Sequence, residues 1–507
     1  MIAVSDAWKA MHQRFLLPET FVEISCAITE VGVQEEATAN GEIQEIISDI
    51  SGITGTSGEE TVKRYATLEP NLWLLDGSRN VLPTEGPYAN AGYVSNMAST
   101  GSVTLRLSKV HTASIPGVTI TWSEEYGEYA TVFTVTAKNG NTVVAETTVT
   151  DNKSNHSLVY LDISNYDSLT VTVHAWNIPD HRTRIDLVRL GLDITFTKRD
   201  ILHYTHEQTG CLVSGELPKN SIEFSLDNSD NRWNPHNPTG LEQYLSERQR
   251  LTVRYGMDID GTTEWIPAGV FYLSEWRTPA NGLEASFVAR DPFEFWLGQD
   301  NPSAIFDQLS GLVETATRLS IPTGCEIIMD ASMDNYSASY VGDGTQAEIV
   351  QKAANAGGCI IRCARDGNIY IEPLNTTQSD FIITAAMSYG YPEMTLSKRL
   401  AAVSVDYGKD LPYVLTVGTA GETQTVDNSF VRSEAQAAMV AQRVKNALVS
   451  RQSITGEFRA DPRLDVFDIV SVESKYGVLS PVVLTGIKYD YSGVFKATYK
   501  GQVLGEG

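Results

Sequence analysis

The chain has 507 residues, of which 63 are acidic and 38 are basic, so its formal net charge is −25. This length exceeds what one hydrophobic core usually serves, so we expect three or more domains. The excess of carboxylates argues against specific nucleic-acid binding, because gripping phosphates requires clustered Lys and Arg side chains.

The sequence carries no signal for a membrane or for an oxidising compartment. It has no run of about 18 apolar residues, so no membrane span is expected. The N-terminus contains Asp6 and lacks an apolar stretch of signal-peptide length. Of the five cysteines, Cys359 and Cys363 are four apart, but no second pair or nearby His completes a zinc site. We expect synthesis in the cytoplasm and cysteines that are small buried side chains.

Residues 1–61 are predicted to begin a β-rich domain. A short helix is expected from Ser5 to His12, followed by a strand over residues 21–28 in which every second side chain is apolar. Residues 37–60 are rich in Ser, Thr, Gly and Glu, which indicates a loop.

Residues 62–197 have the pattern of a separate β-sandwich. Strands are expected at 133–137, 142–149, 169–176 and 185–196, and Asn139-Gly140 is a strong hairpin turn. Because strand-rich segments precede and follow it, this sandwich is predicted to be inserted into a host domain. Residues 198–300 resume that host, with alternating strands at 221–226, 250–256, 269–276 and 283–291.

Residues 301–395 are predicted to form a mixed α/β middle domain. A helix begins after Thr345, which forms a capping box with Glu348, and ends at Gly357-Gly358. The Asp366-Gly367 dipeptide then predicts a hairpin.

Residues 396–507 are predicted to form a second β-domain with a helix over 433–449. Ser433 and Gln436 suggest another capping box. A charged turn at 459–466, containing Pro462, leads into three strands near 468–472, 482–490 and 493–501. Adjacent strands without an intervening helix indicate an antiparallel unit. The predicted fold class is therefore mainly β with a few helices, an α+β multidomain chain.

No motif for an enzyme, a cofactor or a metal is present. The chain lacks an HExxH, a phosphate-binding loop, a dinucleotide fingerprint and a Gly-x-Ser-x-Gly elbow. Residues 227–231 are rich in Asp and Asn, but they lack the Gly and Glu of a calcium loop and are typical of a turn. His203, His206 and Glu207 lack a third placed ligand, and His236 lacks a nucleophile. Pairs such as Glu124-Glu125 carry no glycosidase signal.

Aromatic residues in the predicted sandwich are the only candidate site. Trp122, Tyr126, Tyr129 and Trp176 would supply platforms for a sugar ring. Core packing or a subunit contact is the favoured interpretation, because aromatic residues mostly serve cores and interfaces. The sandwich itself resembles galactose-binding-like carbohydrate-binding modules.

Several segments together resemble the baseplate hub, or tail-tip, proteins of tailed phages and prophages, which also occur in tail-like bacteriocins and contractile injection particles. None of the segments is specific alone, but they follow the order of that family. They are residues 4–8, 65–78, 224–235, 347–358 with 366–367, and 461–465.

The resemblance implies a structural, non-enzymatic subunit at the tip of a virion tail. Residues 1–61 with 198–300, and residues 396–507, would be two barrel-like hub domains, and residues 62–197 would be the inserted sandwich. A homotrimer of such subunits would form a pseudo-sixfold ring between the tail-tube or distal-tail protein and a spike or tip protein. The chain stops after its last strand, so a lytic or fibre function is expected on another chain.

Two other functions stay open at this point. The first is an adsorption protein that binds a cell-wall glycan through residues 62–197. The second is a glycoside hydrolase with an attached binding module, which the lack of a catalytic motif disfavours. We also expect the lumen of the ring to be acidic, so that DNA would slide through it without binding.

Overall fold

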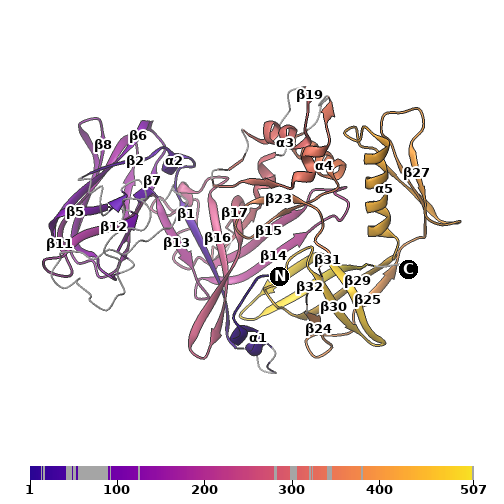
Figure 1. The fold of residues 1–507 in the computed structure, drawn as a ribbon. Helices are drawn as coiled ribbons and strands as arrows, with labels where there is room; N and C mark the ends of the chain where they lie inside the picture. Colours follow the sequence, from indigo (N-terminus) through magenta and orange to yellow (C-terminus); the bar gives the residue numbers. More distant parts are fainter. Residues whose placement is uncertain are drawn as a thin grey trace, which may run out of the picture. The chain divides into compact units, whose positions relative to one another are not determined.

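The computed structural model of the chain describes residues 1–12, 14, 18–41, 48–49, 53–54, 90–91, 93–123, 126–278, 282–296, 305–318, 321–322, 324–339, 345–377, 379 and 381–504. Two compact units result. Unit 1 comprises Met1–Ile24, Phe196–Ser229 and Arg250–Gly507, and unit 2 comprises Ser25–Thr195 and Asp230–Gln249. Both are rich in strands, so the chain is mainly β with a few helices, as the sequence predicts (Figure 1).

Barrel 1 is the first group of strands in unit 1. In pairing order its strands are β1 (Thr20–Ile28), β16 (Arg250–Ile259), β17 (Thr262–Arg277), β18 (Glu284–Arg290), β15 (Lys219–Asp227) and β14 (Ile201–Thr209). Every second side chain of β1 is buried, which is the alternation predicted for residues 21–28.

Barrel 2 is the second group and contains the three C-terminal strands predicted from the sequence. Its strands are β31 (Gly477–Tyr491), β32 (Phe495–Val503), β29 (Gln452–Arg459), β25 (Glu393–Leu396), β30 (Ile469–Ser474) and β24 (Ile382–Ile383). β24 pairs with β30 and β25 pairs with β29, so one segment of chain links the two margins of this sheet. Ser388 bridges to Phe458 on the way. Barrel 2 is therefore closed on the side of residues 382–388.

Helices and small sheets make up the rest of unit 1. The helices are α1 (Asp6–His12), α3 (Leu309–Thr317), α4 (Gln346–Gly357) and α5 (Glu434–Leu448), with short 3-10 turns η3 (Pro292–Trp296) and η4 (Ala331–Asn335). The small sheets are β19 (Ile305–Phe306) with β21 (Ala338–Ser339); β20 (Ile327–Met329), β23 (Ile369–Glu372) and β22 (Ile360–Cys363); and β27 (Tyr413–Thr416), β26 (Leu400–Val405) and β28 (Glu422–Val426).

The predicted helix ends are largely correct. Thr345 Oγ1 accepts from the Glu348 amide at 3.2 Å and the Glu348 carboxylate accepts from the Thr345 amide at 3.3 Å, which is a complete capping box. Gly358 ends α4 in the left-handed region with φ of 75°. At α5, Ser433 caps the Gln436 amide, but the Gln436 side chain accepts from the amide of Arg432 instead, so only half of the predicted box forms.

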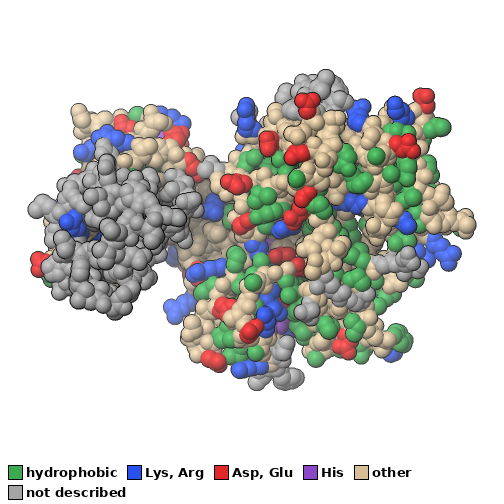
Figure 2. All heavy atoms as spheres, viewed as in Figure 1, with side chains coloured by type: hydrophobic (Ala, Val, Ile, Leu, Met, Phe, Trp, Pro, Cys, Tyr) green, Lys and Arg blue, Asp and Glu red, His purple; other side chains and the backbone are tan. Residues whose placement is uncertain are grey.

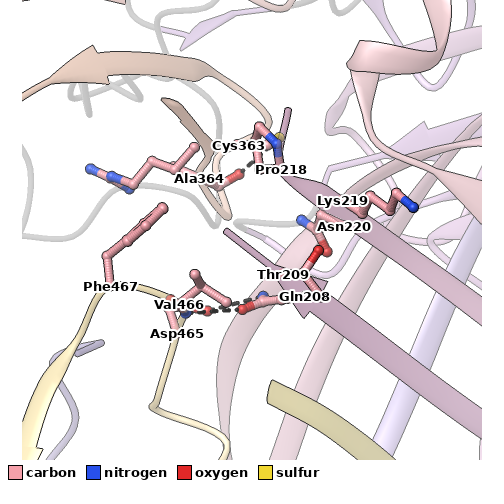
Figure 3. A pocket seen from close by; sticks show the side chains of 11 residues that line it. Gln208, Thr209, Pro218, Lys219, Asn220, Cys363, Ala364, Asp465, Val466 and Phe467 are labelled. Carbon is pink, nitrogen blue, oxygen red and sulfur yellow. Dashed lines mark hydrogen bonds between the residues drawn. The ribbon is translucent and has the colours of Figure 1, made fainter. Parts of the chain in front are cut away.

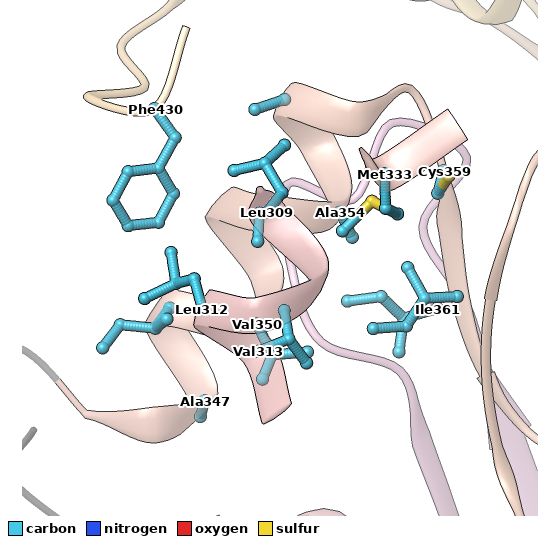
Figure 4. Close-up of a cluster of buried hydrophobic side chains, with 14 of the residues drawn as sticks. Leu309, Leu312, Val313, Met333, Ala347, Val350, Ala354, Cys359, Ile361 and Phe430 are labelled. Atoms are coloured by element: carbon cyan, nitrogen blue, oxygen red, sulfur yellow. The ribbon is translucent and has the colours of Figure 1, made fainter. Parts of the chain in front are cut away.

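One apolar core joins α3, α4 and α5. Leu309, Leu312 and Val313 of α3 face Val350 of α4 and the loop residue Phe430 (Figure 4). The buried side of α5 belongs to the same core. Helix 433–449 therefore packs with the mixed α/β segment as well as following β28 in sequence.

Unit 2 contains two sheets that share one core, which is the predicted sandwich. One sheet is β2 (Thr38–Gly41), β6 (Gly101–His111), β11 (Tyr166–Trp176), β8 (Ala130–Asn139) and β9 (Thr142–Val149). The other is β10 (His156–Ile163), β7 (Ile115–Trp122), β12 (Arg182–Leu190) and β5 (Tyr93–Ala98). Further elements are α2 (Val33–Glu36), β3 (Ser48–Asp49), β4 (Asn90–Ala91), β13 (Leu192–Phe196) and η2 (Glu242–Tyr244).

Two local predictions for unit 2 were wrong. The single strand expected over 185–196 is β12 and β13, separated at Gly191, which has φ of 136°. A Cβ at Gly191 would stand 2.4 Å from the Ile28 carbonyl oxygen, so the chain bends where only glycine fits. The loop expected over 37–60 contains β2, which pairs with β6. The division of the chain into four domains stays a prediction.

Candidate functional site

A row of backbone hydrogen bonds joins the two barrels of unit 1. β14 of barrel 1 pairs antiparallel with β31 of barrel 2, from Tyr204 opposite Tyr491 to Thr209 opposite Gly486. Each strand also pairs within its own barrel, β14 with β15 and β31 with β32. We call this β14–β31 pairing the seam. Because it makes both barrels parts of one sheet, it fixes them side by side.

Buried polar side chains next to the seam form a hydrogen-bonded network centred on His206. The Asn220 amide oxygen is 2.6 Å from His206 Nε2 and can only accept, so Nε2 carries the proton and donates. His206 Nδ1 therefore accepts from the Tyr255 hydroxyl at 2.6 Å, and Tyr255 in turn accepts from Tyr204 at 2.9 Å. Burial lowers the pKa of His206 to about 4, so the imidazole is neutral at physiological pH.

An ion pair ties both barrels to the hairpin between β22 and β23. Arg365 on that hairpin donates from Nε to both carboxylate oxygens of Asp465, at 3.0 and 2.9 Å. Its other nitrogens donate to the carbonyl oxygens of Pro267 in barrel 1, at 2.8 Å, and of Leu464, at 3.1 Å. Gln208 of β14 donates to Asp465 at 3.1 Å (Figure 3). This one guanidinium thus joins the hairpin to barrel 1 and to the turn that precedes β30.

The electrostatics of this ion pair favour its charged form. Burial by itself would raise the pKa of Asp465, but the adjacent Arg365 guanidinium and the hydrogen bonds from Arg365 and Gln208 outweigh it and hold that pKa below its ordinary value. The Arg365 side chain is 5% exposed and the Asp465 side chain is 27% exposed, so the pair is partly buried.

The turn that precedes β30 also receives the N-terminus of the chain. Asp461 is fully buried and accepts from Arg463 Nε at 2.9 and 3.0 Å. The Arg463 carbonyl accepts from the Ile2 amide at 3.0 Å, and His12 Nε2 lies 2.9 Å from the Ala460 carbonyl. The first and last parts of the chain therefore meet at residues 460–468.

The cavity beside the seam is too small for a substrate. Its volume is about 40 Å³, whereas ligand pockets usually measure about 300–1,000 Å³. Its lining consists of Gln208, Thr209, Pro218, Lys219, Asn220, Arg362, Cys363, Ala364, Asp465, Val466 and Phe467 (Figure 3). The seam, its polar side chains and this cavity together form the joint between the two barrels.

A larger open groove, of about 900 Å³, runs beside α5. Its lining includes Arg443, Lys445 and Met439 but no Asp, Glu, His, Cys or Ser. Of the residue types that serve as general bases or nucleophiles, the described lining contains Lys445 and Thr376.

The two tryptophans predicted as sugar platforms are core residues. Trp122 is 0% exposed and Trp176 is 7% exposed, and their rings pack edge to face with centroids 5.9 Å apart. Trp122 Nε1 donates to Ser157 Oγ at 2.9 Å, and Trp176 Nε1 donates to Glu128 at 2.7 Å. Their faces serve the contact between the two sheets, in agreement with the favoured interpretation of core packing.

The two tyrosines of the predicted sugar site are half-buried. The Arg184 guanidinium lies 4.9 Å from the centre of the Tyr126 ring, and Tyr129 packs against the core of the sandwich. The four aromatic residues therefore do not share one open face. Binding of a glycan by residues 62–197 stays a prediction.

The histidines and carboxylates considered as metal ligands are not brought together. Within the residues that the structure describes, no group of three or more His, Cys, Asp or Glu side chains is arranged to hold a metal ion. His203 is exposed whereas His206 is buried, and Asp227 accepts from the Ser229 amide in a local turn. Residues 124–125 lie outside the described part of the chain. Burial raises the pKa of Cys26 to about 12, as expected of an inert thiol.

The residues that form the joint were not identified from the sequence. Arg365 and Asp465 are 100 positions apart, and no spacing rule pairs them. One signal was available, because residues 366–367 and 461–465, which flank or contain these two side chains, are among the segments that carry the family resemblance. The segment 65–78 of that resemblance lies outside the described residues.

No protein-family model and no curated protein matches the chain. Among solved structures, the chain is similar to the 43 kDa tail protein of prophage MuSo2 from Shewanella oneidensis. That match has 12% identity and a TM-score of 0.43, and it covers 61% of this chain and 95% of that one. A tail protein from Neisseria meningitidis MC58 is similar at 13% identity and a TM-score of 0.44, over 61% of this chain and 93% of that one.

A third similar structure is the Escherichia coli c3393 protein, a component of the type VI secretion system with structural similarity to the T4 bacteriophage tail proteins gp27 and gp5. It has 11% identity and a TM-score of 0.38, over 61% of this chain and 74% of that one. The structures similar to this chain thus include tail proteins of prophages and a secretion-system component related to phage tails.

Helices long and apolar enough to cross a membrane do not occur among the described residues.

Proposed function

We propose that this chain is a structural baseplate-hub, or tail-tip, subunit of a phage tail or tail-like particle. Three copies would form a ring that joins the tail tube, or a distal-tail protein, to a spike or tip protein. The subunit is made in the host cytoplasm and works at the tip of the particle without catalysing a reaction.

The seam between β14 and β31 carries this proposal. A chain that holds two barrels side by side in one sheet presents two similar units from a single gene product. Three such chains place six barrels around an axis while keeping threefold symmetry. That geometry suits a part that lies between a sixfold tube and a threefold spike.

The buried polar contacts support a mechanical role. The Arg365–Asp465 pair and the His206 side chain hold the two barrels and the β22–β23 hairpin in one arrangement. A ring that transmits force between a tube and a spike needs such fixed contacts. The net charge of −25 favours an acidic lumen, which would let DNA pass without binding. A mapped lumen that is neutral or basic would contradict this part of the proposal.

Electron microscopy of the purified chain tests the proposal. Class averages should show a threefold ring with a central opening and one peripheral lobe per subunit. If the purified and folded chain shows no ring, that result would contradict the proposal and would favour a monomeric adsorption protein.

A further inference from the structure

The open groove beside α5 is lined mainly by apolar side chains that come from separate parts of unit 1. Met439 belongs to α5, while Leu212, Leu374, Val417 and Leu504 lie just after the strands β14, β23, β27 and β32. On the face drawn in Figure 2, exposed hydrophobic side chains stand among charged ones, as is usual for a protein surface. The groove differs because its apolar residues line one hollow of about 900 Å³, a size typical of ligand sites.

Arg443 of α5 brings a positive charge to this groove. Its Nη2 donates to the Leu212 carbonyl oxygen at 2.7 Å and to Ser214 Oγ at 3.3 Å, and both acceptors are neutral. Its Nη1 is buried and has no hydrogen-bond partner among the described residues. Burial lowers the pKa of Arg443 to about 10, so the guanidinium stays charged at neutral pH. A charged nitrogen shielded from water without a partner is rare in folded proteins and calls for an explanation.

No neighbouring group neutralises this charge within the described part of the chain. The thiol of Cys359 is near enough to act on Arg443, but burial raises the pKa of that thiol, so it is uncharged at neutral pH. Lys445 also lines the groove, and the side chains three and four positions away from either cation are all uncharged. The described lining holds no Asp or Glu, and neither cation pairs with a described carboxylate. In a chain with a net charge of −25, this groove is therefore complementary to a negative group.

The shape of the groove favours a peptide over a small molecule. A small ligand usually has most of its surface buried in its pocket, whereas this groove is open to solvent. In an extended peptide every second side chain points the same way, so one side of the peptide can face the groove while the other stays in water. Apolar side chains would then contact the walls, and a carboxylate among them would reach the cations.

We infer that the groove beside α5 binds an extended acidic segment of a partner protein, with a carboxylate held at Arg443 and Lys445. The inference goes beyond the proposed function and does not depend on the ring, because every described residue of the groove belongs to one chain.

Fluorescein-labelled peptides test the inference on the full chain. In one set leucine and serine alternate, and one leucine is replaced by glutamate; in the matched set glutamine takes the same place. Fluorescence anisotropy should show that the glutamate peptides bind at least about 10-fold more tightly than the glutamine peptides, as expected for one charge-assisted contact. Added salt should reduce this difference.

Variants that remove one cation locate the binding site. Arg443→Met should bind the glutamate peptides about 10-fold more weakly than the wild type and the glutamine peptides equally well. Lys445→Met should change the affinities in the same direction. Lys352→Met, which removes an exposed cation of α4 outside the groove, is the matched control and should bind as the wild type does. The urea unfolding midpoint checks each fold, and Lys445→Met serves as the test should Arg443→Met not fold.

Equal binding of the two peptide sets, or binding of neither, would overturn the inference. Tighter binding of dodecanoate than of the glutamate peptides, lost in Arg443→Met, would assign the groove to an anionic amphiphile and overturn it too. Glu506 follows the groove residue Leu504 by two positions, so Glu506→Gln is a further variant and should bind as the wild type does. A several-fold gain in its affinity would identify the chain's own residues after Leu504 as the occupant, against a partner. The symmetry seen by electron microscopy decides the proposed function separately from these outcomes.

Discussion

Acidification from pH 7 to about pH 4.5 should destabilise unit 1 by about 2.5 kcal/mol through His206 alone. In the folded chain burial keeps the pKa of His206 at about 4, whereas an unfolded histidine titrates near about 6.5. Above the unfolded pKa the imidazole is neutral in both states, so the full stability is present. As the pH falls from there toward 4, only the unfolded chain takes up the proton, and the free energy of unfolding decreases.

The magnitude follows from the difference between the two pKa values. The difference of about 2.5 pKa units corresponds to about 3.4 kcal/mol in total, because one unit is worth about 1.36 kcal/mol. About 2.5 kcal/mol of this is reached at pH 4.5, where the folded imidazole is still mostly neutral and the unfolded one is almost fully protonated.

Urea unfolding of three full-length proteins at both pH values isolates this contribution. His206→Gln removes the titrating group, and His203→Gln removes an exposed histidine three residues away on the same strand. Pulsed hydrogen exchange read on peptides from β14 and β31 reports the unfolding of unit 1 specifically. The wild type and His203→Gln should both lose about 2.5 kcal/mol more than His206→Gln between the two pH values.

Equal losses in the wild type and in His206→Gln would refute the reasoning. That result would mean that His206 takes up its proton in the folded state as easily as in water. The buried Asp461 and the partly buried Asp465 have pKa values below their ordinary range, so protonating them in acid also destabilises the fold. They do so in all three proteins, so the comparison between proteins removes their contribution.

Three further outcomes are expected. Arg365→Met should destabilise unit 1 by about 3 kcal/mol in urea unfolding, because it leaves the Asp465 carboxylate without its cation. Arg362→Met removes a surface ion pair and should cost less than about 1 kcal/mol. Similar losses in the two variants would contradict this assignment. Leu312→Ala should cost about 2–5 kcal/mol by opening a cavity in the core between α3 and α4, and a loss under about 1 kcal/mol would show that this core is not packed as described. Full-length protein should not be retained on immobilised peptidoglycan, and retention that disappears in Tyr126→Ala would instead support the sugar-binding alternative.

Local structure was predictable from the sequence where a few neighbouring residues decide it. The capping box at Thr345, the left-handed Gly358 and the hairpin at Asp366-Gly367 each depend on backbone chemistry within about four residues. The alternation in β1 follows equally from its own side chains. These elements appear in the structure where the sequence places them.

The long-range contacts could not be predicted because no local sequence pattern indicates which elements meet. The pairing of β14 with β31 joins residues nearly 300 positions apart, and only the folded chain brings them together. The same reason left two interpretations open for Trp122 and Trp176. An aromatic residue on a strand has the same sequence pattern whether it points to solvent or to a second sheet, and here both side chains point to the second sheet.

A reconstruction of the parent particle by electron cryomicroscopy would test the central claim most directly. The account predicts three copies of this chain at the tip of the tail, with barrels 1 and 2 alternating around the lumen and the seam intact in every copy. Density for the chain as single copies away from the tip, or with barrels 1 and 2 separated, would contradict it.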